Sequence, residues 1–124
     1  MKKKESELQI SCVNWFRYQY PQYKMLLFSI PNGGLRNIKT AVTLKREGVI
    51  SGVPDLFLSL PRGEWHGMYL ELKSGSNDLT ANQDMFFILA KKQGYKCEVI
   101  RTLDQFIREV TYYLNANLNN KPKE

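Results

Sequence analysis

Apolar and polar residues recur along the chain in segments that predict both helices and strands. Within residues 5–20 the apolar side chains Leu8, Cys12, Trp15 and Phe16 keep the three-to-four spacing of an amphipathic helix, and a proline follows directly. Short apolar runs bounded by glycine, proline and asparagine are typical of strands. The predicted helices cover residues 5–20, 35–48, 80–94 and 103–114, and the predicted strands cover residues 25–30, 55–60, 68–72 and 95–100.

The element order αβαββαβα predicts an α/β sandwich, with a mixed central sheet and helices on both faces. A chain of 124 residues has the size of one domain, so we expect residues 1–124 to form a single unit with a fraying polar tail at about 115–124. Hydrophobic residues make up 43% and charged residues 24%, which excludes a disordered, collagenous or coiled-coil chain. Sheet order does not follow from the sequence.

Positive charge is concentrated in the first part of the chain. The sequence holds 18 Lys and Arg against 12 Asp and Glu, a net charge of +6, and residues 1–50 supply the whole excess. This asymmetry favours a polyanionic partner, nucleic acid before membrane, because no basic helix with a broad apolar face accompanies it. No apolar run is long enough for a membrane span, and Glu5 and Glu7 interrupt any signal peptide, so we expect an intracellular (cytoplasmic) protein.

The scarcity of histidine and cysteine narrows the possible chemistry. Cys12 and Cys97 lie far apart in apolar surroundings without zinc-site spacing, which predicts two reduced core residues. His66 is the one histidine, and no glycine-rich phosphate loop of the Walker type is present. Any catalysis must therefore depend on carboxylates and lysines.

Three such residues fall on two neighbouring predicted strands. The strand period of two places Glu71 and Lys73 on one face, which we expect to be a wet site rather than the core. Glu-x-Lys is common by chance, usually as a solvated strand face, and a lone aspartate after a proline is usually a turn residue. If residues 55–60 and 68–72 form a hairpin, however, Asp55 and Glu71 lie near its open end and their carboxylates converge.

Two converging carboxylates are hard oxygen donors that suit Mg²⁺ or Mn²⁺. Mg²⁺ needs few protein ligands, so Asp55, Glu71 and one backbone carbonyl, which we expect to be that of Leu72, would be enough. Such an ion lowers the pKa of water and polarises a phosphate oxygen, while Lys73 orients or deprotonates the water and offsets developing charge. The chemistry that these residues indicate is phosphodiester hydrolysis.

These residues resemble the PD-(D/E)xK signature of restriction-endonuclease-like nucleases, and more narrowly the VRR-NUC (virus-type replication-repair nuclease) family. The resemblance runs from about residue 5 to residue 106, and the ordered combination is more specific than any single motif. The matching positions are Glu5 with Gln9, Ile30-Pro31-Asn32-Gly33-Gly34 with Arg36, Gly48, Gly52-Val53-Pro54-Asp55, Glu71-Leu72-Lys73, and Leu79-Thr80 with Gln83.

The resemblance implies a restriction-endonuclease-like fold with Asp55 and Glu71 as metal ligands and Lys73 as the water-activating residue. It also makes Gln83 a supporting active-site residue and Glu5 an additional acid near the metal. Three alternatives remain open at this stage. Glu7 replaces Glu5 if the helix register differs; Glu5 is a helix-start acid that complements the macrodipole; and Gln83 is the N3 member of a capping box with Thr80.

The segment between the first strand and the second helix is a candidate DNA contact. In a plain strand-to-helix turn, the glycines would only supply positive φ. Exposed backbone N–H groups followed by two basic side chains also make a phosphate cradle, and this is the interpretation we favour. The candidate DNA-binding residues are Asn32, Gly33, Gly34, Arg36 and Lys39.

Together these features predict a Mg²⁺- or Mn²⁺-dependent DNA endonuclease. Small members of the family resemble Holliday junction resolvases and are bacterial or phage-encoded, so the resemblance implies a homodimer that cuts branched DNA. A flap or nicking nuclease, a non-catalytic nucleic-acid-binding module and a hydrolase of small phosphate esters are the alternatives. The aromatic residues expected to be exposed on the first and last helices, as a dimer surface, include Trp15, Tyr18, Tyr20, Tyr112 and Tyr113.

Overall fold

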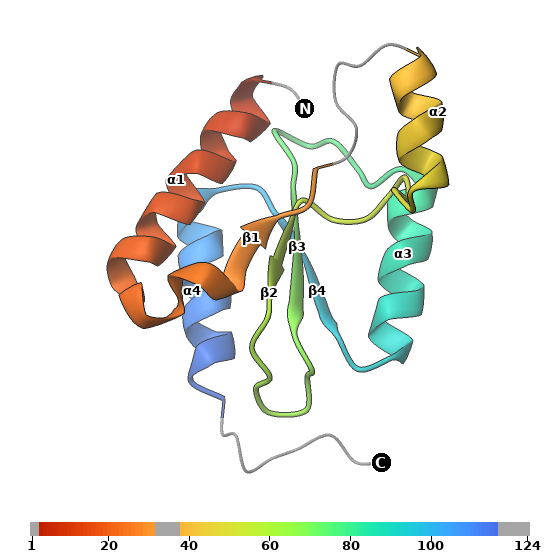
Figure 1. Ribbon diagram of the computed structural model, residues 1–124. Coiled ribbons are helices and arrows are strands. Elements are labelled where there is room, and N and C mark those ends of the chain that lie inside the picture. The colour runs from red at the N-terminus through yellow and green to blue at the C-terminus, as the bar shows by residue number, and fades with distance from the viewer. Residues whose placement is uncertain (1–2, 32–37, 117–124) are drawn as a thin grey trace.

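The computed structural model describes residues 3–31 and 38–116, and its elements follow the predicted order (Figure 1). A short 3₁₀ helix, η1, is added between the first helix and the first strand. The helices are α1 (Lys3–Gln19), α2 (Ile38–Arg46), α3 (Ala81–Lys92) and α4 (Leu103–Leu114), the 3₁₀ helix is η1 (Pro21–Leu26), and the strands are β1 (Leu27–Ser29), β2 (Leu56–Leu58), β3 (Met68–Leu72) and β4 (Lys96–Ile100).

The four strands form one mixed sheet in the order β1-β2-β3-β4. Strands β1 and β2 pair antiparallel, β2 and β3 form the predicted antiparallel hairpin, and β3 pairs with β4 in parallel. Parallel neighbours need a crossover connection, and α3 supplies it. The mixed sheet that the element order predicted is therefore confirmed.

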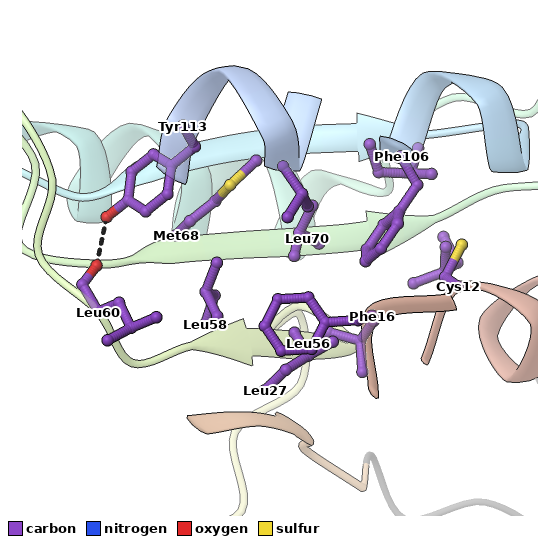
Figure 2. Close-up of a cluster of buried hydrophobic side chains, with 13 residues drawn as sticks. Cys12, Phe16, Leu27, Leu56, Leu58, Leu60, Met68, Leu70, Phe106 and Tyr113 are labelled. Carbon is purple, nitrogen blue, oxygen red and sulfur yellow. Dashed lines mark hydrogen bonds between the residues drawn. The ribbon is translucent and has the colours of Figure 1, made fainter. Parts of the chain in front are cut away.

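Helices α1 and α4 cover one face of the sheet and form the main core with it (Figure 1). Phe16 of α1 and Phe106 of α4 are fully buried against Leu56 and Leu70 from the two central strands. Figure 2 shows these side chains converging, with the Tyr113 hydroxyl donating a hydrogen bond of 2.6 Å to the carbonyl of Leu60. The polar end of this large side chain is thus satisfied inside the core.

Helix α3 covers the opposite face, over the side of the sheet formed by β3 and β4 (Figure 1). Phe87 and Ala90 pack there against Cys97 of β4, with Tyr69 of β3 partly buried beside them. Strand β3 therefore has helices on both of its faces. Any polar side chain of β3 that points toward α3 is consequently removed from bulk water.

Two strands are shorter than the sequence predicts. The predicted strand 25–30 is reduced to β1 because Pro21 begins η1, in which the Tyr23 N–H donates to the Tyr20 carbonyl at 2.9 Å. The predicted strand 55–60 is likewise reduced to β2. Helix α2 is described from Ile38 onward, because residues 35–37 lie outside the described part. It ends at Arg46, and Gly48, the predicted stop, lies just beyond it with a φ of +107°.

The aromatic side chains expected on the surface are mostly inside the protein. Tyr113 is fully buried, and Trp15 and Tyr20 pack partly buried against the main core. Tyr18 and Tyr112 do remain exposed, at 86% and 67%. The expectation of a broad aromatic surface on these two helices was therefore wrong for three of its five residues. Trp15 and Tyr20 contact each other and further rings of α1, η1 and α4, and the ring of Tyr113 packs against Trp65.

Cys12 and Cys97 are both unpaired and buried, as the sequence predicted. Burial raises the pKa of the Cys12 thiol to about 12 and that of Cys97 to about 11. Both thiols thus stay protonated at neutral pH and serve as small apolar core groups. Among the described helices, none is long and apolar enough to cross a bilayer.

Candidate active site

The β2–β3 hairpin brings Asp55 and Glu71 together at its open end. Leu56 pairs with Leu70, so Asp55 just before β2 lies across from Glu71. An Asp55 side-chain oxygen, Oδ2, accepts a hydrogen bond of 2.8 Å from the backbone N–H of Leu72. This bond fixes the Asp55 carboxylate against the end of β3, as the sequence-based hairpin argument predicted.

Glu71 is a buried carboxylate with one free acceptor. Its residue exposure is 4%, and its Oε2 accepts a hydrogen bond of 3.0 Å from Gln83 Nε2 and lies 3.8 Å from Lys73 Nζ. The other oxygen, Oε1, is buried and receives no hydrogen bond from an N–H or hydroxyl group of the described residues, although the Asp55 carboxyl is close enough to share a proton with Glu71. An ionised carboxylate is stable in such a place only if a cation or a proton meets that free oxygen.

Gln83 joins helix α3 to this carboxylate. Its Oε1 accepts from the Thr80 N–H at 2.9 Å, and its backbone N–H donates to Thr80 Oγ1 at 3.2 Å, which completes a capping box. At the same time its Nε2 donates to Glu71. The two interpretations left open for Gln83 are therefore compatible, because the two ends of one amide serve the helix cap and the carboxylate separately.

Of the two acids in the first turns of α1, Glu5 is the one that faces the site. Its Oε2 accepts from the Ser74 N–H at 3.3 Å and from Ser74 Oγ at 3.2 Å, which ties α1 to the loop directly after Lys73. Glu7 is exposed. The helix register thus favours Glu5 over Glu7 as the acid beside the carboxylate pair.

Asp55 and Glu71 resist ionisation. Burial, and then the negative charge of Asp55, raises the pKa of Glu71 from its ordinary value of 4.5 to about 8, although the Lys73 ammonium opposes the shift. Burial also raises the pKa of Asp55, against the lowering effect of its hydrogen bond from Leu72. At neutral pH without a cation, the pair therefore retains a proton.

Burial distinguishes this site from the expected wet strand face. Lys73 has a residue exposure of 8%, and Glu71 is still less exposed. The expectation was wrong because α3 covers the face of β3 that carries both side chains, through Gln83 and the aromatic contact of Phe86 with Tyr69. A buried site lowers the effective dielectric around its charges and strengthens their mutual interactions.

Comparison with known proteins identifies the family of this chain. The model of the VRR-NUC domain matches residues 1–103. The chain belongs to the VRR-NUC family. A solved structure described as a VRR_NUC domain protein is similar at 25% sequence identity and a TM-score of 0.82, and the match covers 100% of this chain and 99% of that one. Among curated proteins, no sequence matches.

Asp55 and Glu71 lie close together in this VRR-NUC domain, but they are not part of a group of three side chains placed to bind a metal ion. Within residues 3–31 and 38–116, no group of three His, Cys, Asp or Glu side chains is placed to hold a metal ion. Glu5 instead bonds to Ser74, which leaves Asp55 and Glu71 as the close pair. The backbone N–H of Leu72 donates to Asp55, which places Leu72 beside this pair. That its carbonyl oxygen binds a metal ion stays a prediction.

The predicted phosphate cradle of the VRR-NUC domain falls largely outside the described residues. Asn32, Gly33, Gly34 and Arg36 lie there, and Lys39 is placed in α2 by its backbone alone. Their assignment to DNA contact therefore stays a prediction from the sequence.

Two polar contacts near the site were not found from the sequence. Ser74 holds Glu5 from a position next to Lys73, and neither its residue type nor its spacing signalled this contact. Gln9 was part of the family resemblance without a role, and its Nε2 donates to Ser29 Oγ at 3.3 Å while its Oε1 is buried without a partner. Helical spacing of four residues places Gln9 on the same side of α1 as Glu5, which was the one available signal.

Proposed function

We propose that this VRR-NUC domain is a divalent-metal-dependent DNA endonuclease that hydrolyses phosphodiester bonds. The observation that carries the proposal is the buried oxygen Oε1 of Glu71, which has no partner in the described structure although Asp55 lies beside it and Lys73 is 3.8 Å from its other oxygen. Adjacent hard oxygen donors in a buried site suit Mg²⁺ or Mn²⁺. Asp55 and Glu71 would hold the ion, with the Leu72 carbonyl as a further donor.

Each side chain of the site then has a defined task. The divalent ion supplies Lewis acidity and makes water a stronger acid. The Lys73 ammonium orients the attacking water and offsets the negative charge that develops on the phosphate oxygens. Gln83 and the Leu72 N–H hold Glu71 and Asp55 in position through the bonds described above. Water adds to phosphorus, the bond from phosphorus to one ester oxygen breaks, and that oxygen leaves with a proton.

We propose branched DNA as the substrate. The net charge of +6 supports a polyanionic ligand, and carboxylates beside Lys73 would hinder simple phosphate binding, which argues against a module that binds without cutting. The test is incubation of the protein with labelled four-way junction, flap, nicked, duplex and single-stranded DNA in Mg²⁺, Mn²⁺ and EDTA. Preferential cutting of the junction supports the proposal. Preferential cutting of flap or nicked DNA would identify a flap or nicking nuclease instead, and no cutting in either metal would overturn the nuclease proposal.

Gln83→Leu is expected to lower single-turnover cleavage by roughly 10-fold and stability by about 1 kcal/mol, because it removes both the cap and the Glu71 bond. Gln83→Glu separates these effects. Glutamate still accepts from the Thr80 N–H, and the protonated Glu71 carboxyl of the metal-free protein can donate to it, so stability in EDTA should be largely kept. A metal-bound Glu71 is ionised and is repelled by the new carboxylate, so cleavage should fall. Chemical denaturation and a cleavage assay measure the two. Equal cleavage by Gln83→Glu and the wild type would limit Gln83 to its capping role.

We propose a homodimer, because symmetric cutting of a two-fold junction needs two sites and one small domain carries one. The aromatic residues first expected to form the dimer surface are mostly buried, so they no longer support a dimer. Support comes instead from exposed apolar residues on α3, among them Met85 and Leu89 at 54% each and Ile88 at 44%. Size exclusion with light scattering should report twice the monomer mass, and Leu89→Glu should return the protein to the monomer. A monomer at micromolar concentration, with and without junction DNA, would remove the resolvase interpretation and leave the metal site unaffected.

A further inference from the structure

Arg101 leaves the sheet directly beside Lys73. Strands β3 and β4 are parallel, Leu72 pairs with Ile100, and the Lys73 N–H donates to the Ile100 carbonyl at 3.0 Å. Lys73 and Arg101 are therefore the next residues on two adjacent strands, about 4.8 Å apart across the sheet. The loops after both strands lie at the same end of the sheet (Figure 1).

The backbone around Arg101 is fixed by two hydrogen bonds from one side chain of α4. Gln105 Oε1 accepts from the Arg101 N–H at 2.8 Å, and Gln105 Nε2 donates to the Val99 carbonyl at 2.8 Å. One glutamine side chain thus holds the main chain on both sides of Ile100. The position of Arg101 relative to Lys73 is consequently set by the fold and not by its own side chain.

The guanidinium of Arg101 retains most of its binding capacity. Its Nη1 donates to the Gly75 carbonyl at 2.9 Å, in the loop that follows Lys73. An arginine has five N–H donors, and Arg101 forms no ion pair with any carboxylate of the described residues. A side chain added at Gly75 would meet nothing within 4 Å, so the loop borders open space.

The negative charges of the site would repel DNA unless a nearby cation such as Arg101 offset them. Glu5, Asp55 and Glu71 influence one another electrostatically, and Lys73 is already engaged with Glu71. A DNA backbone that approaches these carboxyl groups is repelled by those that are ionised, and a metal ion at the pair offsets only part of that repulsion. An unpaired guanidinium one strand away from Lys73 can hold a phosphate by a bidentate contact.

We propose that Arg101 binds a DNA backbone phosphate next to the one that is cut, and so positions the substrate for Lys73. This inference rests on the proposed nuclease function and adds to it a substrate contact that lies outside the motif residues. It assigns Arg101 to binding of the substrate and not to the chemical step.

The test is the salt dependence of binding to a labelled four-way junction in EDTA. Arg101→Gln should weaken binding by roughly 5- to 10-fold at 50 mM NaCl and make the slope of log K against log salt less steep by about 0.9, the loss of one phosphate contact. Arg101→Lys keeps the charge and should keep the slope. Arg108→Gln removes an exposed arginine from the middle of α4 and serves as the matched control, with no change in slope.

A second measurement uses the wild-type protein and does not depend on a variant that folds. Junction DNA should protect Arg101, but not Arg108, from modification by phenylglyoxal, as read by mass spectrometry. An unchanged slope for Arg101→Gln, an equal change for Arg108→Gln, or modification of Arg101 at the same rate with and without DNA would overturn the inference. Wild-type protein that binds the junction but cuts nothing in Mg²⁺ or Mn²⁺ would instead overturn the nuclease proposal, whatever the slopes show.

Discussion

Lys73→Met and Asp55→Asn are each expected to reduce the single-turnover rate of DNA cleavage by about 1,000-fold. Lys73 is the cation held 3.8 Å from Glu71, and preorganised charge of this kind typically contributes about 100- to 1,000-fold to the rate. Asp55→Asn removes one of two carboxylates that would hold the metal, while its amide oxygen still accepts from the Leu72 N–H. Rapid-quench cleavage of a labelled junction at saturating protein measures both rates.

Lys92→Met is the matched control for the lysine variant, because Lys92 is an exposed lysine at the end of α3. It should cut at the wild-type rate. Circular dichroism should show the same helix content in all variants, since neither substitution removes an apolar core side chain. Near wild-type cutting by a folded Lys73→Met or Asp55→Asn protein would show that the assignment of that residue is wrong.

Glu71→Gln is expected to remove a large part of the pH dependence of stability of the metal-free protein. The pKa of Glu71 is raised to about 8, so the folded state binds this proton more tightly than the unfolded state does. The resulting stabilisation is fully present below pH 4.5, the ordinary value, and is lost as the pH rises through 8. Glutamine has nearly the same shape and carries no titrating proton.

Thermal unfolding in EDTA between pH 5 and pH 9 measures this effect. The wild type should lose several degrees more in Tm across that range than Glu71→Gln does. Glu98→Gln is the matched control, because it makes the same substitution at a half-buried carboxylate outside the site, on β4, where Glu98 pairs with Lys96. Parallel curves for the wild type and Glu71→Gln would mean that Glu71 is ionised in the metal-free fold and that its free oxygen needs no proton.

Much of the fold was accessible from the sequence because its signals are local. The strand Met68–Leu72 and the helix Leu103–Leu114 have the predicted ends, since apolar periodicity and turn residues mark both. The hairpin follows from the short polar connection between β2 and β3, and its open end gathers Asp55 and Glu71. These two carboxylates were predictable together because their meeting depends on strand register alone.

The remaining features depend on contacts between distant segments. Ser74 meets Glu5 across 69 positions of sequence, and nothing local to either residue indicates that contact. The burial of Lys73 depends on where α3 crosses the sheet, which the lysine's own strand does not reveal. The sheet order and the inward packing of Tyr113 likewise follow from tertiary packing and not from periodicity.

We propose above all that a divalent ion held by Asp55 and Glu71 enables this domain to cut DNA. Single-turnover cleavage of one labelled four-way junction, with the wild type and Asp55→Asn assayed in parallel across a Mg²⁺ and a Mn²⁺ titration and in EDTA, tests it most directly. We expect cutting by the wild type that saturates with metal, none in EDTA, and a rate for Asp55→Asn lower by about 1,000-fold. Cutting in EDTA at the rate seen in Mg²⁺ would rule out a need for the ion, and equal rates for the two proteins would rule out Asp55 as its ligand.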